Sequence, residues 1–342
     1  MRRAELEAAI RANRDDGAAY DVFADWLLAH GDPLGELIAL ERRDDPSLGS
    51  RILDLRAELV RWPDPPDLSD NAFRNGFDAS WRWGLWDRVA ISCLSSIREC
   101  RDDTPAVAQL GFAHPACAAL RELHFDLHDW RFDADVDEPP VLAAADGHAW
   151  ARELHTLHAG QIDPALGLAA ELGRCSGAIS RIFPGLRVLA LFGDDVELAE
   201  LELRRLTKLH LFMPGLSEAR IAELCAATLP ALEHLELDTE ELAPAPLVAI
   251  ATGVFPTLRS LSIHGDTAVD DFARSLASSP IAARLEHLEL ELTDGTALAL
   301  DPANLPRLRS LAIRGIESST RARLVDRFPR ASINARSSRY IV

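Results

Sequence analysis

The sequence has few aromatic residues and no uninterrupted apolar segment long enough to cross a membrane. Aromatic residues make up 6% of the 342 residues, whereas hydrophobic residues of all kinds make up 48%, so the core must be built mainly from leucine and alanine. A membrane-spanning helix needs about 20 consecutive apolar residues. Residues 1–7 also lack the apolar run of a signal peptide. We therefore expect no membrane association and a cytoplasmic location.

Metal-binding cysteine pairs and known catalytic motifs are missing as well. The five cysteines are scattered, and none has the C-x-x-C spacing of a redox or zinc site. There is no G-x-S-x-G elbow, phosphate loop, H-E-x-x-H motif or dinucleotide fingerprint. We expect a reduced protein that is not an enzyme and has no cofactor.

Positive charge is scarce relative to negative charge. The formal net charge is −18, and an acidic surface repels nucleic-acid and anionic lipid phosphates, whose binding depends on lysine and arginine. Nucleic-acid binding is therefore not expected. The excess of carboxylates favours a partner protein with a basic surface. Solubility is an alternative explanation of the same excess.

The first forty residues have the pattern of three short helices. Asp15 or Asp16 can cap the second helix, which ends at Gly31. Asp32 can cap the third, with Pro33 at its first position, where the missing N–H costs nothing. Three helices of this size form a compact cap that is too small to be very stable alone.

A motif in these helices is similar to a known domain. Residues 25–40 read D-W-L-L-A-H-G-D-P-L-G-E-L-I-A-L, which resembles the short repeat-companion domain found at the amino terminus of bacterial proteins with leucine-rich or other repeats. The resemblance covers residues 3–43 and implies a soluble bacterial repeat protein, but no activity. Trp26 is interpreted as a core anchor of this domain.

A junction separates this cap from the rest of the chain. Residues 51–61 predict a helix, residues 62–67 are rich in proline, and residues 79–83 alternate as in a strand that covers the open end of a sheet. All seven tryptophans precede residue 151, which marks the N-terminal part as differently built. We predict a helical repeat-companion domain at 1–45, a helical junction and cap at 46–118, and repeats at 119–342.

The remaining chain repeats one pattern, L-x-x-L-x-L. Its intervals of 20 to 34 residues, and the prolines that precede several copies, indicate a strand followed by a helical return. One such unit cannot bury its apolar face alone, so neighbouring units must stack. The copies start at Leu120, Leu154, Leu186, Leu206, Leu232, Leu258, Leu285 and Leu308, and a degenerate closing copy holds Ala331 and Ile333.

This pattern resembles leucine-rich repeats over residues 119–334. The predicted fold is therefore α/β, an open leucine-rich-repeat solenoid with parallel strands on the concave face and helices or turns on the convex face. The asparagine that the family usually places after the motif is replaced throughout, for example by Pro214, Glu240 and Asp266. The repeat subclass and the curvature are therefore left open. The prediction that neighbouring repeats stack does not depend on the asparagine.

Residues between the motif leucines should line the concave face in columns, because successive strand side chains point to opposite faces. Concave solenoid faces commonly bind proteins. We predict a non-enzymatic scaffold that binds a basic protein there and could sequester or inhibit it. Polar residues are also what any solvated sheet face requires. The candidate binding residues are Phe192, Lys208, His210, Phe212, His234, Glu236, Asp238, His264, His287, Glu289 and Glu291.

Two other functions are compatible with the sequence. His234, Glu236, His264, His287 and Glu289 could converge on zinc or iron in a metal-dependent enzyme. Alternatively, the N-terminal cap binds the partner and the repeats only support it. The acidic residues from 133 to 138 lack the glycine and closing glutamate of a calcium loop, and we interpret them as a solvated insertion.

Overall fold

A computed structural model of the chain forms two compact units. Unit 1 comprises residues 1–127 and 140–157, and unit 2 comprises residues 128–139 and 158–342. The residues whose structure is described are 2–60, 76–93, 104–127, 139–160, 162–163, 168–169, 174–193, 196–239, 241–242, 244–251, 254–265, 269–276 and 278–336. The acidic insertion at 133–138 and the proline-rich junction at 62–67 lie outside them.

Unit 1 begins with helices that enclose a small core. Phe23, Leu27 and Leu37 are fully buried in it. Trp26, expected as a core anchor, packs at the rim instead, with its ring stacked on His30 at 4.0 Å between centroids. The elements are α1 (Arg3–Ala12), α2 (Gly17–Ala29), α3 (Pro33–Arg42), the 3-10 helix η1 (Pro46–Leu48) and α4 (Gly49–Leu59).

The predicted helix boundaries in this region are confirmed. Asp16 accepts a hydrogen bond from the Ala18 amide, and Asp32 accepts one from the Leu34 amide, both at 3.0 Å. These caps satisfy amides that have no partner within their own helix. Gly31, between the two helices, has φ = 72°, a conformation that glycine adopts at little cost.

Strands follow the helices in unit 1. The expected strand near residue 80 is β1 (Phe77–Arg82), an edge strand that is antiparallel to β2 (Leu85–Cys93) through a two-residue turn at Trp83 and Gly84. The first parallel pair is therefore β2 with β3 (Glu122–Leu127). Further elements are α6 (Thr104–Ala113), η3 (Pro115–Ala119), α7 (Pro140–Ala143), η4 (Ala151–Glu153) and β4 (Thr156–Ala159), within which the boundary between the units falls.

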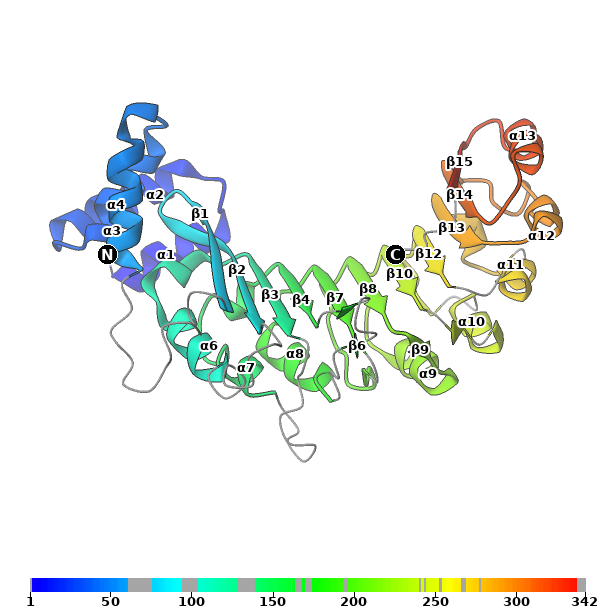
Figure 1. Cartoon of the computed structure of the whole chain (residues 1–342), viewed down its shortest axis with the longest axis horizontal. Coiled ribbons are helices and arrows are strands. Elements are labelled where there is room, and N and C mark those ends of the chain that lie inside the picture. Colours follow the sequence, from blue (N-terminus) through cyan, green and yellow to red (C-terminus); the bar gives the residue numbers. More distant parts are fainter. Residues whose placement is uncertain are drawn as a thin grey trace. The chain divides into compact units, whose positions relative to one another are not determined.

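Unit 2 contains a parallel sheet of seven strands with helices on one side (Figure 1). The first and last of these described strands do not pair, so this sheet is not closed. In sheet order the strands are β7 (Val188–Phe192), β8 (Lys208–Phe212), β10 (His234–Asp238), β12 (Ser260–His264), β13 (His287–Glu291), β14 (Ser310–Arg314) and β15 (Ser332–Arg336).

Each return segment in unit 2 is short and mostly helical. Two small strand pairs, β5 (Ile162–Asp163) with β6 (Leu168–Ala169) and β9 (Gly215–Leu216) with β11 (Glu241–Leu242), lie outside the main sheet. None of the described helices is long and apolar enough to cross a membrane. The helices are α8 (Ser176–Ile182), α9 (Glu218–Ala226), α10 (Pro244–Ala251), α11 (Asp270–Leu276), α12 (Asp294–Ala299) and α13 (Ser318–Arg327).

The motif leucines of unit 2 are in register and buried. Parallel pairing places Leu209, Leu235 and Leu261 side by side, and the same holds two residues later along each strand. Every one of these positions is at most 2% exposed. The two buried columns hold Leu189, Leu209, Leu235, Leu261, Leu288 and Leu311, and Leu191, Leu211, Leu237, Ile263, Leu290 and Ile313.

Two uncertain segments of the repeat pattern are resolved. The stretch from Leu198 to Leu203 mimics the motif at the wrong spacing. Its three leucines are buried, but it forms only an isolated bridge between Glu202 and Thr228. The closing copy, expected to be degenerate, is the full strand β15, and its Ile333 pairs with Leu311. The spacing between copies therefore separates true strands from imitations better than the motif alone does.

We expect Leu235→Ala to destabilise the protein by about 2–5 kcal/mol, because it removes buried methyl groups and leaves a cavity between two strands. The measurement is the guanidinium chloride unfolding midpoint by circular dichroism. His234→Ala, an exposed position on the same strand, is the control and should change the unfolding free energy by less than about 0.5 kcal/mol. Equal effects of the two substitutions would contradict the buried-column structure.

Candidate functional site

The sheet of unit 2 presents three columns of side chains on the face opposite its leucines, which we call the polar face. Parallel neighbours in a column lie about 4.8 Å apart along the sheet. The first column is Val188, Lys208, His234, Ser260, His287 and Ser310. The middle column is Ala190, His210, Glu236, Ser262, Glu289 and Ala312. The last column is Phe192, Phe212, Asp238, His264, Glu291 and Arg314.

Aromatic side chains gather at the β7–β8 end of the polar face. The Phe192 ring stacks on the His158 ring at 6.3 Å between centroids and meets the His210 ring edge-on at 5.1 Å. Phe212 pairs with Phe192 on the neighbouring strand and is half-buried. These contacts hold the Phe192 ring in place.

Glu236 lies at the centre of a loose charge cluster. Its carboxylate oxygens are 3.7 Å from the Lys208 Nζ and 4.0 Å from the His210 Nε2, which is beyond hydrogen-bond distance in both cases. No residue in the described ranges donates a hydrogen bond to this carboxylate, and its side chain is 32% exposed. It therefore keeps hydrogen-bonding capacity on a solvent-accessible face.

Glu289 is more tightly held. Its Oε1 accepts hydrogen bonds from the Arg314 Nη2 at 2.9 Å and Nε at 3.2 Å, and the His264 Nε2 lies 4.0 Å away. The side chains of Arg314 and His264 are only 10% and 7% exposed. A charged pair this buried fixes the two strands relative to each other, so Glu289 is less available to a partner than Glu236.

Two histidines of the polar face, His264 and His210, favour the neutral form. Burial lowers the pKa of His264, the Arg314 charge lowers it further, and Glu289 and Glu236 only partly oppose this. Burial likewise lowers the pKa of His210. The buried His210 Nε2 and His264 Nδ1 have no hydrogen-bond partner among the described residues. These two imidazoles therefore favour the neutral form and keep hydrogen-bonding capacity.

All predicted binding residues lie on the polar face, but they do not form one cluster. His234 and His287 are exposed in the first column, two strands apart, with Ser260 between them. Among the residues with described positions, no group of three or more histidine, cysteine, aspartate or glutamate side chains is arranged to hold a metal ion. The five residues considered for zinc or iron are thus not brought together here.

Arg314 is a site residue that the sequence places on the polar face but that the list of candidate binding residues leaves out. It lies 25 residues from Glu289, and the β13–β14 register brings the two side chains together diagonally. The available signal was a lone arginine in the last column, one repeat beyond a glutamate in the middle column. Charge counting along the chain cannot show such a pair, because it depends on the register of the strands.

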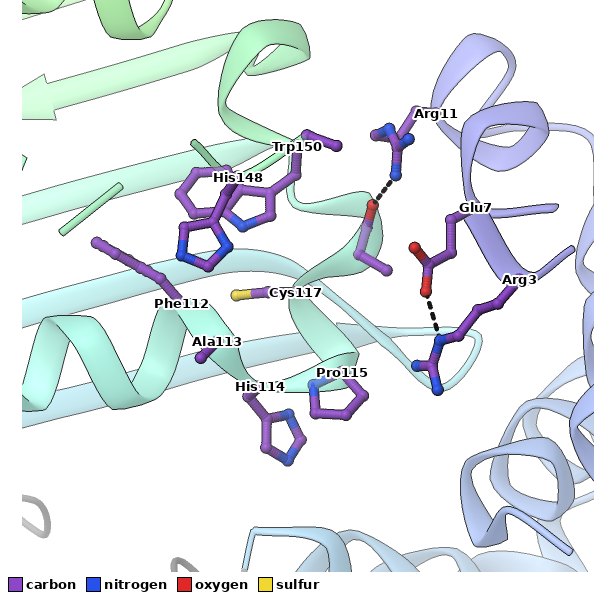
Figure 2. A pocket seen from close by; sticks show the side chains of 12 residues that line it. Arg3, Glu7, Arg11, Phe112, Ala113, His114, Pro115, Cys117, His148 and Trp150 are labelled. Atoms are coloured by element: carbon purple, nitrogen blue, oxygen red, sulfur yellow. Dashed lines mark hydrogen bonds and ion pairs between the residues drawn. The ribbon is translucent and has the colours of Figure 1, made fainter. Parts of the chain in front are cut away.

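Unit 1 contains a separate pocket of about 290 Å³ (Figure 2). Arg3, Glu7 and Arg11 project into it from α1, opposite the stacked rings of His148 and Trp150. The charges of this pocket are compensated within unit 1: Arg3 pairs with Glu7 at 2.7 Å, and Arg11 pairs with Glu153 at 3.6 Å. Arg11 also donates to the Ala118 carbonyl. We regard this pocket as the weaker of the two candidate sites.

Comparison with known proteins supports the fold only. A structural genomics target from Bacteroides fragilis matches 69% of this chain and 71% of its own length, with a TM-score of 0.52 and 14% sequence identity. No protein-family model matches the chain, and no curated protein matches its sequence. The chain is thus an α/β protein with a largely parallel sheet and a repetitive strand–helix order, compatible with a solenoid.

We expect the unfolding free energy to decrease as the pH falls from about 7.5 to about 5.5, because burial lowers the pKa of His264 and His210, so the unfolded chain takes up protons at these two residues more readily than the folded chain does. The pKa of His264 in the folded state lies below the ordinary 6.5, so its share of stability is complete above 6.5 and is lost below it. His264→Gln should reduce this pH dependence, as measured by chemical unfolding at a series of pH values.

Ser262→Ala is the matched control, because it changes a non-titrating side chain on the same strand. It should keep the full pH dependence of the wild-type protein. A His264→Gln curve that runs parallel to the wild-type curve would show that the folded state does not resist protonation of His264.

Proposed function

We propose that unit 2 is a leucine-rich-repeat solenoid that binds a basic protein through its polar face and performs no catalysis itself. The observation that carries the proposal is the ordered set of columns on this face, in which aromatic, histidine and acidic side chains are partly exposed on neighbouring strands. A solvated sheet face needs only polar residues. Half-buried phenylalanines beside carboxylates go beyond that requirement and are typical of binding surfaces.

The leucine-rich-repeat assignment is supported by the buried columns. The same two positions of each motif copy are buried from β7 to β14, and each strand is followed by a short return. A stack of this kind leaves one sheet face available along its length, which is the face that solenoids use for extended partners. The helices α1 to α3 are, in this proposal, the repeat-companion cap.

The preference for a basic partner follows from the distribution of charge. Glu236 and Asp238 lie on one strand, and the nearest cation of the polar face, Lys208, is loosely placed and half exposed. The formal net charge of −18 adds long-range attraction for a basic surface. Such attraction steers association more than it strengthens the complex. Sequestration or inhibition of a basic protein would suit this surface.

We expect the double substitution Glu236→Lys and Asp238→Lys to abolish capture of basic proteins from a native lysate, because it reverses the charge at the centre of the polar face. Glu218→Lys with Asp326→Lys is the matched control, since it makes the same change in net charge at exposed positions on α9 and α13. Quantitative mass spectrometry of the captured proteins, with unfolding midpoints to confirm folding, provides the measurement.

The control protein should retain the wild-type set of captured proteins, and added salt should release that set from both, because exposed charges are screened within about 8 Å at physiological ionic strength. Retention of the same set by the Glu236→Lys, Asp238→Lys protein would exclude the polar face as the binding surface. Loss of the set on deletion of residues 1–45 alone would assign binding to the cap instead.

A further inference from the structure

Three side chains in the first column of the polar face are able to carry a positive charge. Lys208, His234 and His287 lie on β8, β10 and β13, and all three are exposed. Ser260, a small side chain, lies between the two histidines. A partner that lies on the polar face therefore meets these three side chains directly.

His234 has charged groups of both signs around it. Lys208 lies beside it on the neighbouring strand, Glu233 precedes it, and Glu236 follows on the same face, about 7 Å along the strand. Burial lowers the pKa of His234, Glu233 opposes this shift, and the charges of Lys208 and His287 add to it. His234 is therefore neutral at pH 7.5, and a proton that it gains on acidification puts a positive charge close to Glu236.

The charged groups nearest to His287 are paired with one another. Serines flank His287 on both neighbouring strands, and arginines hold the carboxylates one residue before it and two residues after it. These groups are Ser260, Ser310, Glu286 with Arg259 and Arg309 at 3.4 Å each, and Glu289 with Arg314 at 2.9 Å. A proton gained by His287 thus adds a positive charge to the first column rather than completing an ion pair.

We infer that acidification weakens the binding of the basic partner, because protonated His234 and His287 join Lys208 in a row of three positive charges. This inference rests on the proposed function and adds the regulation of that binding by pH. Histidine changes its charge between pH 5 and pH 8, whereas lysine and glutamate keep theirs over this range. Like charges placed opposite a partner oppose its association. The row therefore repels a basic surface at low pH only.

The test is binding of a lysine-rich peptide with an acetylated amino terminus and no histidine, measured by fluorescence anisotropy against the full chain at pH 7.5 and 5.0. The charge of this peptide is the same at both pH values, so a difference in affinity comes from the protein. We expect about fivefold weaker binding at pH 5.0, the ratio that two exposed charge contacts of ordinary strength produce. The His234→Gln, His287→Gln protein should bind with nearly equal affinity at both pH values.

His30→Gln with His148→Gln is the matched control, because it removes two histidines of unit 1 that do not belong to the polar face. It should keep the fivefold loss. All measurements are made at physiological ionic strength, where charges farther than about 8 Å from the peptide are largely screened. Circular dichroism at each pH confirms that every protein is folded.

The outcomes separate this inference from the proposed function. A His234→Gln, His287→Gln protein that loses affinity on acidification as the wild type does, or a wild-type protein that binds equally at both pH values, overturns the inference while the binding of basic proteins stands. If the peptide does not bind at pH 7.5, or if Glu236→Lys with Asp238→Lys binds it as the wild type does, the proposed function fails and the inference fails with it.

Discussion

Burial of leucine side chains between neighbouring strands is the interaction on which the structure of unit 2 depends. One strand with its return segment cannot cover its own apolar side chains completely, and the neighbouring copy covers the rest. A fully buried leucine contributes about 1.5–3 kcal/mol relative to an exposed one. Leu235 obtains that contribution only because Leu209 and Leu261 flank it in register. The stability of each copy is therefore shared with its neighbours.

The same constraint positions the polar face. Strand side chains alternate, so turning Leu235 and Leu237 inward leaves His234, Glu236 and Asp238 on the opposite side. Parallel register then extends this arrangement from strand to strand as columns. The apolar residues thus determine where the side chains of the polar face lie, although they do not determine which side chains these are.

Much of this arrangement could be predicted from the sequence, because it depends on local patterns. Helix caps at Asp16 and Asp32 and the repeated leucines are signals of spacing and residue type. Strand β2 was missed because its residues do not alternate: Val89 and Ile91 are buried, and so are Trp86 and Ala90. A strand buried on both faces lacks the period of two by which strands are found.

The charge pairs could not be predicted in the same way, and they change which charges of the polar face are accessible. The Arg314 guanidinium donates a hydrogen bond to Glu289. The negative charge of this carboxylate, which counts as acidic in the sequence, is therefore largely neutralised. Burial keeps the pKa of His264 and His210 low, so these two histidines add hydrogen-bonding groups rather than charge. What remains acidic and accessible concentrates near Glu236, beside the aromatic residues. Exposed ion pairs alone contribute little affinity, so a basic partner of the kind proposed would also need contacts with the half-buried phenylalanines of this face.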